Sequence, residues 1–266
     1  MSIIKYNKFY FYKEISEMKK ILALVLAALM LFACVACGTT DDTTADNTVT
    51  DAPETNAPET DDVKVMTYAE YDAAALDAPV VIEAYVQATQ SWWDNKITVY
   101  TQDKDGAYFI YNMTCSEEDS AKLVPGTKIR VTGFKTAWAG EIEVAEGATF
   151  EIVEGADTYI AEAEDVTALL GTEDLIKHQN KLVSFKGLTL KAVEYKNGEP
   201  GDDIYVTVEK DGVDYSFCVE VYLTGTDTEV YKAFATLEVG AKVDVEGFLY
   251  WYEGVNTHIT AVKAAE

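Results

Sequence analysis

Aromatic side chains stand at three places in the sequence where they could contact a ligand, around residues 92–93, at residue 138 and over residues 250–252. Flat apolar rings with one polar edge suit sugars, bases or peptide backbones. The alternative is packing, because tryptophan is mostly buried on average and a protein with two modules needs a seam. Tyr100, Tyr108 and Tyr111 could extend an aromatic platform, but ordinary sheet packing is the favoured interpretation. The candidate ligand-binding residues are Trp92, Trp93, Trp138, Tyr250, Trp251 and Tyr252.

Residues for catalysis or metal binding are scarce. Neither His178 nor His258 belongs to a ligand pair or a triad spacing, and no hydrolase, metalloprotease or phosphate-loop motif is present. The acidic turn after Asp103 begins like a calcium loop, but Thr114 stands where the closing glutamate is needed. The sequence therefore predicts a protein that is not an enzyme and that has no metal and no cofactor.

The charge of the chain bears on its partners. The formal net charge is −25, with 21 Lys and Arg against 46 Asp and Glu. Broad nucleic-acid binding is driven by the release of cations around phosphates that Lys and Arg neutralise. A chain this acidic repels phosphates, so the sequence disfavours nucleic acid as a partner.

The first 37 residues have the pattern of a lipoprotein signal peptide. Two lysines after Met18 precede a short apolar run and then small residues before cysteine. Cys37 lies between Ala36 and Gly38, as in a bacterial lipobox, and Cys34 is the alternative site of lipid attachment. Met18 is the expected start, because residues 1–17 do not contribute to the pattern. The prediction is export and palmitate-type anchoring to the outer face of the cell membrane.

A linker is predicted over residues 38–64. Residues 38–63 contain no Lys or Arg, many Thr and Asp, and a duplicated Ala-Pro-Glu-Thr. Such a segment cannot bury enough apolar surface to offset the entropy of ordering it. We expect a disordered spacer between the anchor and the rest of the chain.

An internal repeat divides the remainder. Residues 123–134 and 237–248 share Leu, Gly, Lys, a β-branched residue, Val, Gly and Phe at identical spacing. Alternating apolar residues between turn residues predict similar strands in each copy. The predicted strands are 80–89, 96–102, 107–113, 128–134 and 141–153 (with a break near Gly147), then 182–193, 204–209, 215–223, 242–250 and 258–263. Short helices are expected over 68–76, 116–124, 163–177 and 227–237.

Three strands, a helix and two closing strands is the order of the oligonucleotide/oligosaccharide-binding (OB) fold. The Gly-x-Lys-[Ile/Val]-x-Val-x-Gly-Phe strand of each copy resembles the fourth strand of bacterial OB modules, and the chain resembles OB-repeat lipoproteins of Gram-positive anaerobes. The resemblance implies an all-β chain with short helices, built as two tandem five-stranded OB-like barrels over 65–156 and 157–266. It implies a ligand surface on strands two and three and the loops beside them.

These observations lead to a ranked set of functions. The first is a membrane-anchored extracellular lipoprotein that binds a glycan or another cell-envelope component without catalysis. The alternative is an assembly lipoprotein that binds another envelope protein through the aromatic loops. Binding of single-stranded nucleic acid ranks third because of the charge. The sequence leaves the oligomeric state open.

Overall fold

The computed structural model of the chain describes residues 64–265. The predicted signal peptide, both candidate lipidation cysteines, Cys34 and Cys37, and nearly all of the predicted linker lie outside the described residues. None of the helices in the described part is long and apolar enough to cross a membrane.

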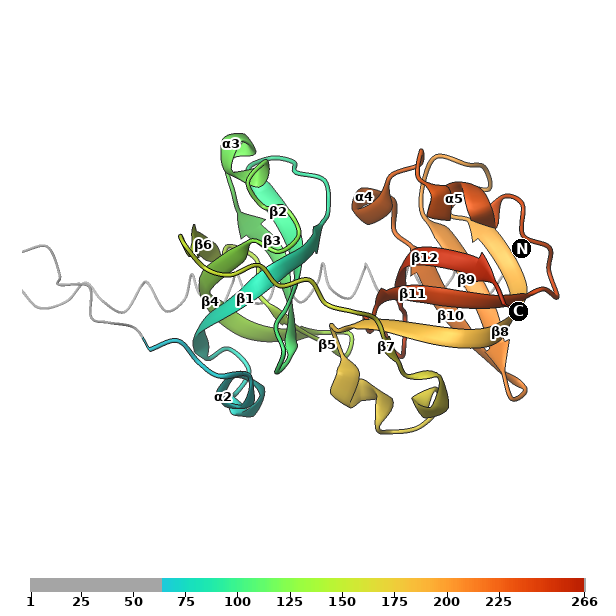
Figure 1. Ribbon diagram of the computed structural model, residues 1–266, viewed down its shortest axis with the longest axis horizontal. Helices are drawn as coiled ribbons and strands as arrows, with labels where there is room; N and C mark the ends of the chain where they lie inside the picture. Colours follow the sequence, from blue (N-terminus) through green and yellow to red (C-terminus); the bar gives the residue numbers. More distant parts are fainter. Residues whose placement is uncertain (1–63, 266) are drawn as a thin grey trace, which may run out of the picture. The chain divides into compact units, whose positions relative to one another are not determined.

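The first barrel is formed by five strands, with a sixth at its edge (Figure 1). The strand order is β1-β2-β3-β5-β4, and pairing of β1 with β4 closes the barrel, while β6 pairs with β4. The elements are α2 (Tyr68–Ala73), β1 (Pro79–Thr89), β2 (Lys96–Gln102), β3 (Ala107–Thr114), α3 (Glu117–Ser120), β4 (Lys128–Trp138), β5 (Glu141–Val144) and β6 (Thr149–Ile152).

The second barrel repeats this arrangement. Its order is β8-β9-β10-β12-β11, closed by pairing of β11 with β8, and β7 adds to the edge of β8. The elements are β7 (Glu164–Asp165), η1 (Thr167–Leu169), η2 (Leu175–His178), β8 (Leu182–Tyr195), β9 (Ile204–Lys210), β10 (Val213–Val219), α4 (Val221–Thr224), α5 (Glu229–Phe234), β11 (Lys242–Phe248) and β12 (His258–Ala264).

The repeated motif occupies equivalent positions in the two barrels. Gly133 on β4 pairs with Val80, and Gly247 on β11 pairs with Val183. In each barrel the third strand pairs in parallel with the last one, β3 with β5 and β10 with β12. The predicted fold class, all-β with short helices and OB-like barrels, is therefore confirmed.

Alternation along the strands fills each barrel with apolar side chains. Ile82, Ala84 and Val86 of β1 point into the first barrel, and Val206 and Val208 of β9 point into the second. The side chains between them face outward, because successive residues of a strand point to opposite faces. This alternation decides which residues of β2 and β3 are available outside the barrel.

Two predicted elements differ from the structure. The segment 163–177, expected to be helical, holds the short strand β7 and two 3₁₀ turns, and Gly171 between them has a φ of 89° that interrupts a helix. The strand expected over 215–223 ends at Val219. There the Glu220 side chain accepts a hydrogen bond from the backbone N–H of Leu223 and begins α4 instead.

Candidate functional site

The outer face of β2 and β3, where an OB barrel is expected to take its ligand, is covered by the second barrel. Tyr100 of β2 stacks on Phe248 with 4.5 Å between ring centroids, and Phe109 of β3 meets Tyr250 edge-on at 5.2 Å. Tyr100, Phe109 and Phe248 form a separate buried cluster outside both barrel cores. We call this contact the seam. It closes the centre of the first barrel's expected ligand surface.

Polar contacts fix the alignment of the seam. The Tyr100 hydroxyl lies 2.6 Å from Nδ1 of His258, and the Gln102 side-chain carbonyl accepts a hydrogen bond from the Leu182 backbone N–H at 2.8 Å. Burial lowers the pKa of His258 to about 3. The imidazole is therefore neutral at physiological pH and forms a neutral hydrogen bond with Tyr100.

Glu141, the first residue of β5, joins the two barrels from the other end of the seam. Its side chain is fully buried, and Oε2 accepts hydrogen bonds from the Trp251 backbone N–H at 2.8 Å and from Gln179 Nε2 at 3.2 Å. The other oxygen, Oε1, has no partner within residues 64–265. Burial raises the pKa of Glu141 to about 9 and that of the neighbouring Glu143 to about 7. Glu141 is therefore protonated at neutral pH.

Three of the six predicted ligand-binding residues are engaged in packing. The indole of Trp92 donates a hydrogen bond to the Cys115 carbonyl at 2.8 Å and packs on the first barrel core. Tyr250 lies between Phe109 and His258, with 4.3 Å between its ring centroid and that of the imidazole. Trp251 packs on the second barrel core and against Gly140.

The other three predicted residues are exposed, and all three precede tight turns. Trp93, Trp138 and Tyr252 have 56%, 62% and 52% of their surfaces accessible. The turn after Trp93 uses positive φ at both central residues, and so does the turn after Trp138. This is the geometry of the two-residue turn that matches the twist of paired strands. The rings are therefore held by short hairpins rather than by long loops.

Tyr111 of β3 is a fourth exposed ring, which the sequence analysis assigned to packing. Tyr100 and Tyr108 are buried as expected, but Tyr111 is 41% exposed. Alternation along β3 does place Tyr111 on the face opposite Tyr108, which is the sequence signal for its exposure. The prediction failed because the face that carries Phe109 and Tyr111 is covered only in part.

These four rings are related to one another through the groups that lie between them. The ammonium group of Lys96 lies over the Trp93 ring, 5.8 Å from its centroid, and close to Tyr111. Tyr111 and Tyr252 both lie near the Tyr250 hydroxyl, whose pKa is raised chiefly by burial. The residue after Tyr252 donates its backbone N–H to the Ala139 carbonyl, at 2.7 Å, beside Trp138. We call Trp93, Tyr111, Tyr252 and Trp138 the aromatic row.

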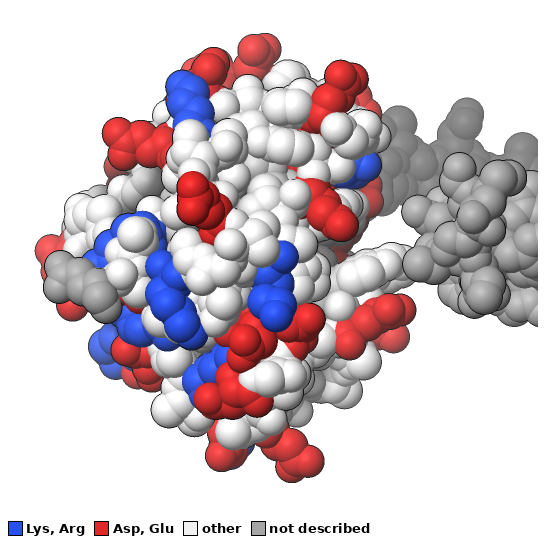
Figure 2. All heavy atoms as spheres, turned by 90° about the vertical axis from the view of Figure 1, so that its right-hand side faces the viewer, with Lys and Arg blue, Asp and Glu red and all other residues white. Residues whose placement is uncertain are grey.

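Cations are few along the aromatic row. Lys96 forms an ion pair with Glu146, and Asp94 and Glu253 stand in the turns beside the exposed rings. The face of the molecule drawn in Figure 2 likewise shows Lys and Arg side chains lying among Asp and Glu. Within residues 64–265 no group of three or more His, Cys, Asp or Glu side chains is arranged to hold a metal ion.

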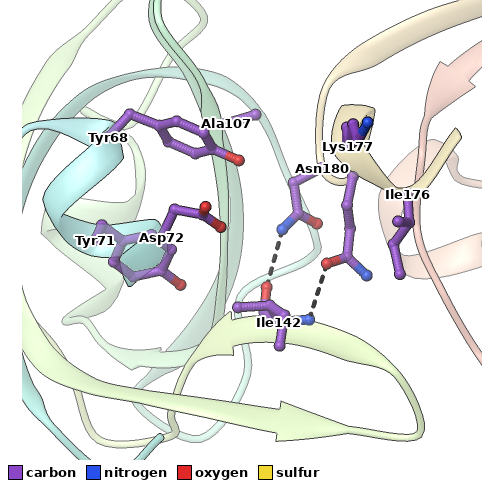
Figure 3. Close-up of a pocket in the computed structure, with 9 residues that line it drawn as sticks. Tyr68, Tyr71, Asp72, Ala107, Ile142, Ile176, Lys177 and Asn180 are labelled. Atoms are coloured by element: carbon purple, nitrogen blue, oxygen red, sulfur yellow. Dashed lines mark hydrogen bonds between the residues drawn. The ribbon is translucent and has the colours of Figure 1, made fainter. Parts of the chain in front are cut away.

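A separate pocket of about 460 Å³ lies beside α2. Figure 3 shows Tyr68, Tyr71 and Asp72 of α2 on one side, Ile176, Lys177 and Asn180 on the other, and Ile142 of β5 below. The Asn180 amide donates a hydrogen bond to the Ile142 carbonyl at 2.9 Å. Ala107 and Gln179 complete the lining.

Comparisons with known proteins give likenesses of structure only. No family model and no curated protein matches the sequence. A murine DNA-binding protein bound to double-stranded DNA is similar at 11% identity and a TM-score of 0.33, over 68% of this chain and 92% of that one. The p204 HINb domain is similar at 13% identity and a TM-score of 0.33, over 71% of this chain and 97% of that one. A replication protein A heterotrimer bound to single-stranded DNA is similar at 13% identity and a TM-score of 0.30, over 71% of this chain and 52% of that one.

These comparisons contradict two expectations from the sequence. The ranking that put a glycan or envelope component first, and an assembly role second, is wrong, because the similar structures include DNA complexes and none of the three is described as binding a carbohydrate. The expectation that nucleic acid is disfavoured is wrong for the same reason. None of the three descriptions names an enzyme. What those proteins bind is their own property.

Proposed function

We propose that the tandem barrels bind single-stranded nucleic acid without catalysis, with bases stacked on the aromatic row. The observation that carries the proposal is four exposed rings, contributed by both barrels, on a fold that commonly binds oligonucleotides. Every base has a flat face, so stacking on aromatic side chains tolerates any sequence and contributes about 1–3 kcal/mol per base.

The charge of the chain shapes the proposed binding. Affinity that comes from phosphate contacts falls with salt in proportion to the number of cations engaged. Lys96 is the cation that lies over a ring of the row, and the net charge of −25 repels the phosphates of any nucleic acid. We therefore expect modest affinity with a shallow dependence on salt, because stacking rather than phosphate neutralisation supplies the free energy of binding.

The test is a titration of a short fluorescent oligothymidine with the full chain at low salt. Trp138→Ala removes an exposed ring from the row, and we expect it to weaken binding by about 5- to 150-fold, from the contribution of one stacked base. Phe134→Ala is the matched control, because Phe134 lies on the same strand, is exposed to a similar extent (56% against 62% for Trp138) and is outside the row.

The two variants separate the outcomes. Loss of affinity in Trp138→Ala with unchanged affinity in Phe134→Ala supports stacking on the row. Absence of binding by the unaltered chain contradicts the proposal, and so does an equal loss in both variants. Thermal unfolding of each variant checks that the barrels remain folded.

We also propose that the chain is exported and anchored through Cys37. Support comes from the lysine pair, the apolar run and the small residues before the cysteine. When cells are grown with a clickable fatty acid, the unaltered chain should carry the label. Cys37→Ser should lose it while Cys34→Ser keeps it. A label retained by Cys37→Ser and lost by Cys34→Ser would move the attachment to Cys34.

A further inference from the structure

The pocket beside α2 has the size and the lining of a small-molecule site. Its volume of about 460 Å³ lies within the range of ligand pockets, about 300–1,000 Å³. Ring and alkyl groups of Tyr68, Ile142 and Ile176 supply apolar surface, and polar groups stand at opposite sides (Figure 3). Such a lining suits a flat ring with polar substituents at its edge.

The wall on α2 is rigid. The ring of Tyr68 lies against Gly106, where a Cβ atom would come within 2.0 Å of it, and meets Tyr108 edge-on at 5.5 Å. Helix α2 itself begins with a capping box between Thr67 and Glu70. Lys135 holds its other end by donating hydrogen bonds to the carbonyls of Tyr71, Asp72 and Ala74.

The polar groups of the pocket include one carboxylate, that of Asp72, among hydroxyl, amide and ammonium groups. Figure 3 shows the Tyr68 hydroxyl and the Asp72 carboxylate pointing toward the wall that carries Asn180. The Asn180 amide nitrogen donates one hydrogen bond to Ile142, and its carbonyl oxygen is an acceptor beside the remaining N–H. A carboxylate accepts hydrogen bonds from an exocyclic amino group such as N4 of cytosine.

We infer that this pocket binds a heteroaromatic ring bearing an amino group, such as adenine or cytosine. The ring packs against Tyr68 and Ile176, and its amino group donates to Asp72. The same chemistry occurs in a free nucleoside and in an unstacked base of a strand. The inference goes beyond stacking on the aromatic row, and the free nucleoside binds through residues outside the row.

The experiment is calorimetric titration of the full chain with adenosine, with cytidine and with thymidine. Adenosine and cytidine should bind and thymidine should bind at least about tenfold more weakly, because it lacks the amino group that pairs with the carboxylate. Tyr68→Phe removes a hydroxyl that points into the pocket, and Asp72→Ala removes the acceptor, so both should weaken adenosine binding. Tyr85→Phe is the matched control, because Tyr85 of β1 packs against Tyr159 and does not line the pocket.

The outcomes distinguish this inference from the proposed function. Absence of adenosine binding, or equal binding of thymidine, overturns the pocket assignment even where oligothymidine still binds the row. Adenosine binding that Asp72→Ala abolishes and Trp138→Ala leaves unchanged supports the pocket even where oligothymidine fails to bind. If oligoadenylate competes with adenosine and oligothymidine does not, the pocket also takes a base of a strand. If neither oligonucleotide competes, the occupant is the free nucleoside.

Discussion

Gly247 shows how the repeated motif depends on one missing side chain. A Cβ atom placed there would lie 2.2 Å from the His258 backbone carbonyl oxygen, far closer than van der Waals contact allows. At the equivalent Gly133 the nearest atoms would be side-chain carbons of Val144 and Ala148, at 2.7 and 2.9 Å. The same glycine is therefore required in both barrels, by the backbone in one and by side chains in the other.

We predict that Gly247→Ala destabilises the chain more than Gly133→Ala. At Gly133 the Val144 methyl group can rotate away from a new Cβ atom, and the fixed Cβ of Ala148 is less close, at 2.9 Å. At Gly247 the contact is with a backbone carbonyl in a strand pair, which cannot move without disturbing the sheet. Overpacking of this kind costs about 1–3 kcal/mol, with Gly247→Ala at the upper end. Urea unfolding of both variants measures the difference. A smaller loss for Gly247→Ala would contradict the carbonyl contact.

At the scale of elements, strand β5 is the one whose electrostatics are most unusual. Glu141 and Glu143 are two residues apart, so they point to the same face, and both are buried against the seam. Burial raises the pKa of each, to about 9 and about 7. The folded chain therefore retains protons on β5 that the unfolded chain has already released.

Glu141→Gln should reduce the loss of stability at alkaline pH. The unfolded glutamate ionises near pH 4.5 and the folded one near pH 9, so the folded state binds more protons in between and stability falls as the pH rises through that window. Glutamine keeps an oxygen for the Trp251 N–H without ionising. Urea unfolding over a pH series measures how the free energy of unfolding changes with pH.

Glu143→Gln serves as the comparison for β5. Its effect should be confined to the window between about pH 4.5 and 7, because the folded pKa of Glu143 is about 7. Above pH 7, the free energy of unfolding should fall less steeply with pH in Glu141→Gln than in the unaltered chain. Equal slopes would show that Glu141 is ionised in the folded state.

At the scale of the whole molecule, the seam joins two similar barrels into one structure in which ionisation is coupled to folding. His258 has a folded pKa of about 3 against 6.5 when unfolded, so the unfolded state binds an extra proton between those values and stability falls as the pH drops. Glu141, Glu143 and Glu220 act in the opposite direction above pH 4.5.

Stability should therefore be greatest at mildly acidic pH, between about pH 4 and 5. The three buried carboxyl groups outweigh His258 as the pH rises from there, and the growing negative charge of the chain adds repulsion. Melting temperatures recorded from pH 3 to 10 locate the maximum. A maximum above pH 7 would show that these carboxyl groups are not protonated in the fold.

Much of the architecture could be predicted from the sequence, because it depends on local patterns. Alternating apolar residues located the strands around Val80, Ile204 and Lys242 to within a few residues. The short helix expected from residue 116 is present, and it begins with two hydrogen bonds between Ser116 and Asp119. The region 163–177 was mispredicted, because its 3₁₀ turns and short strand depend on contacts with β8.

The sequence alone determined that two copies of one strand pattern close into OB-like barrels, since periodicity and the repeated glycines are local properties of the chain. Only the tertiary structure decided which aromatic rings are free. Tyr250 and Trp251 are engaged because β3 and β5, distant in sequence, lie against them, whereas Tyr252 is exposed. Burial depends on what packs from elsewhere in the chain, and no local pattern encodes it.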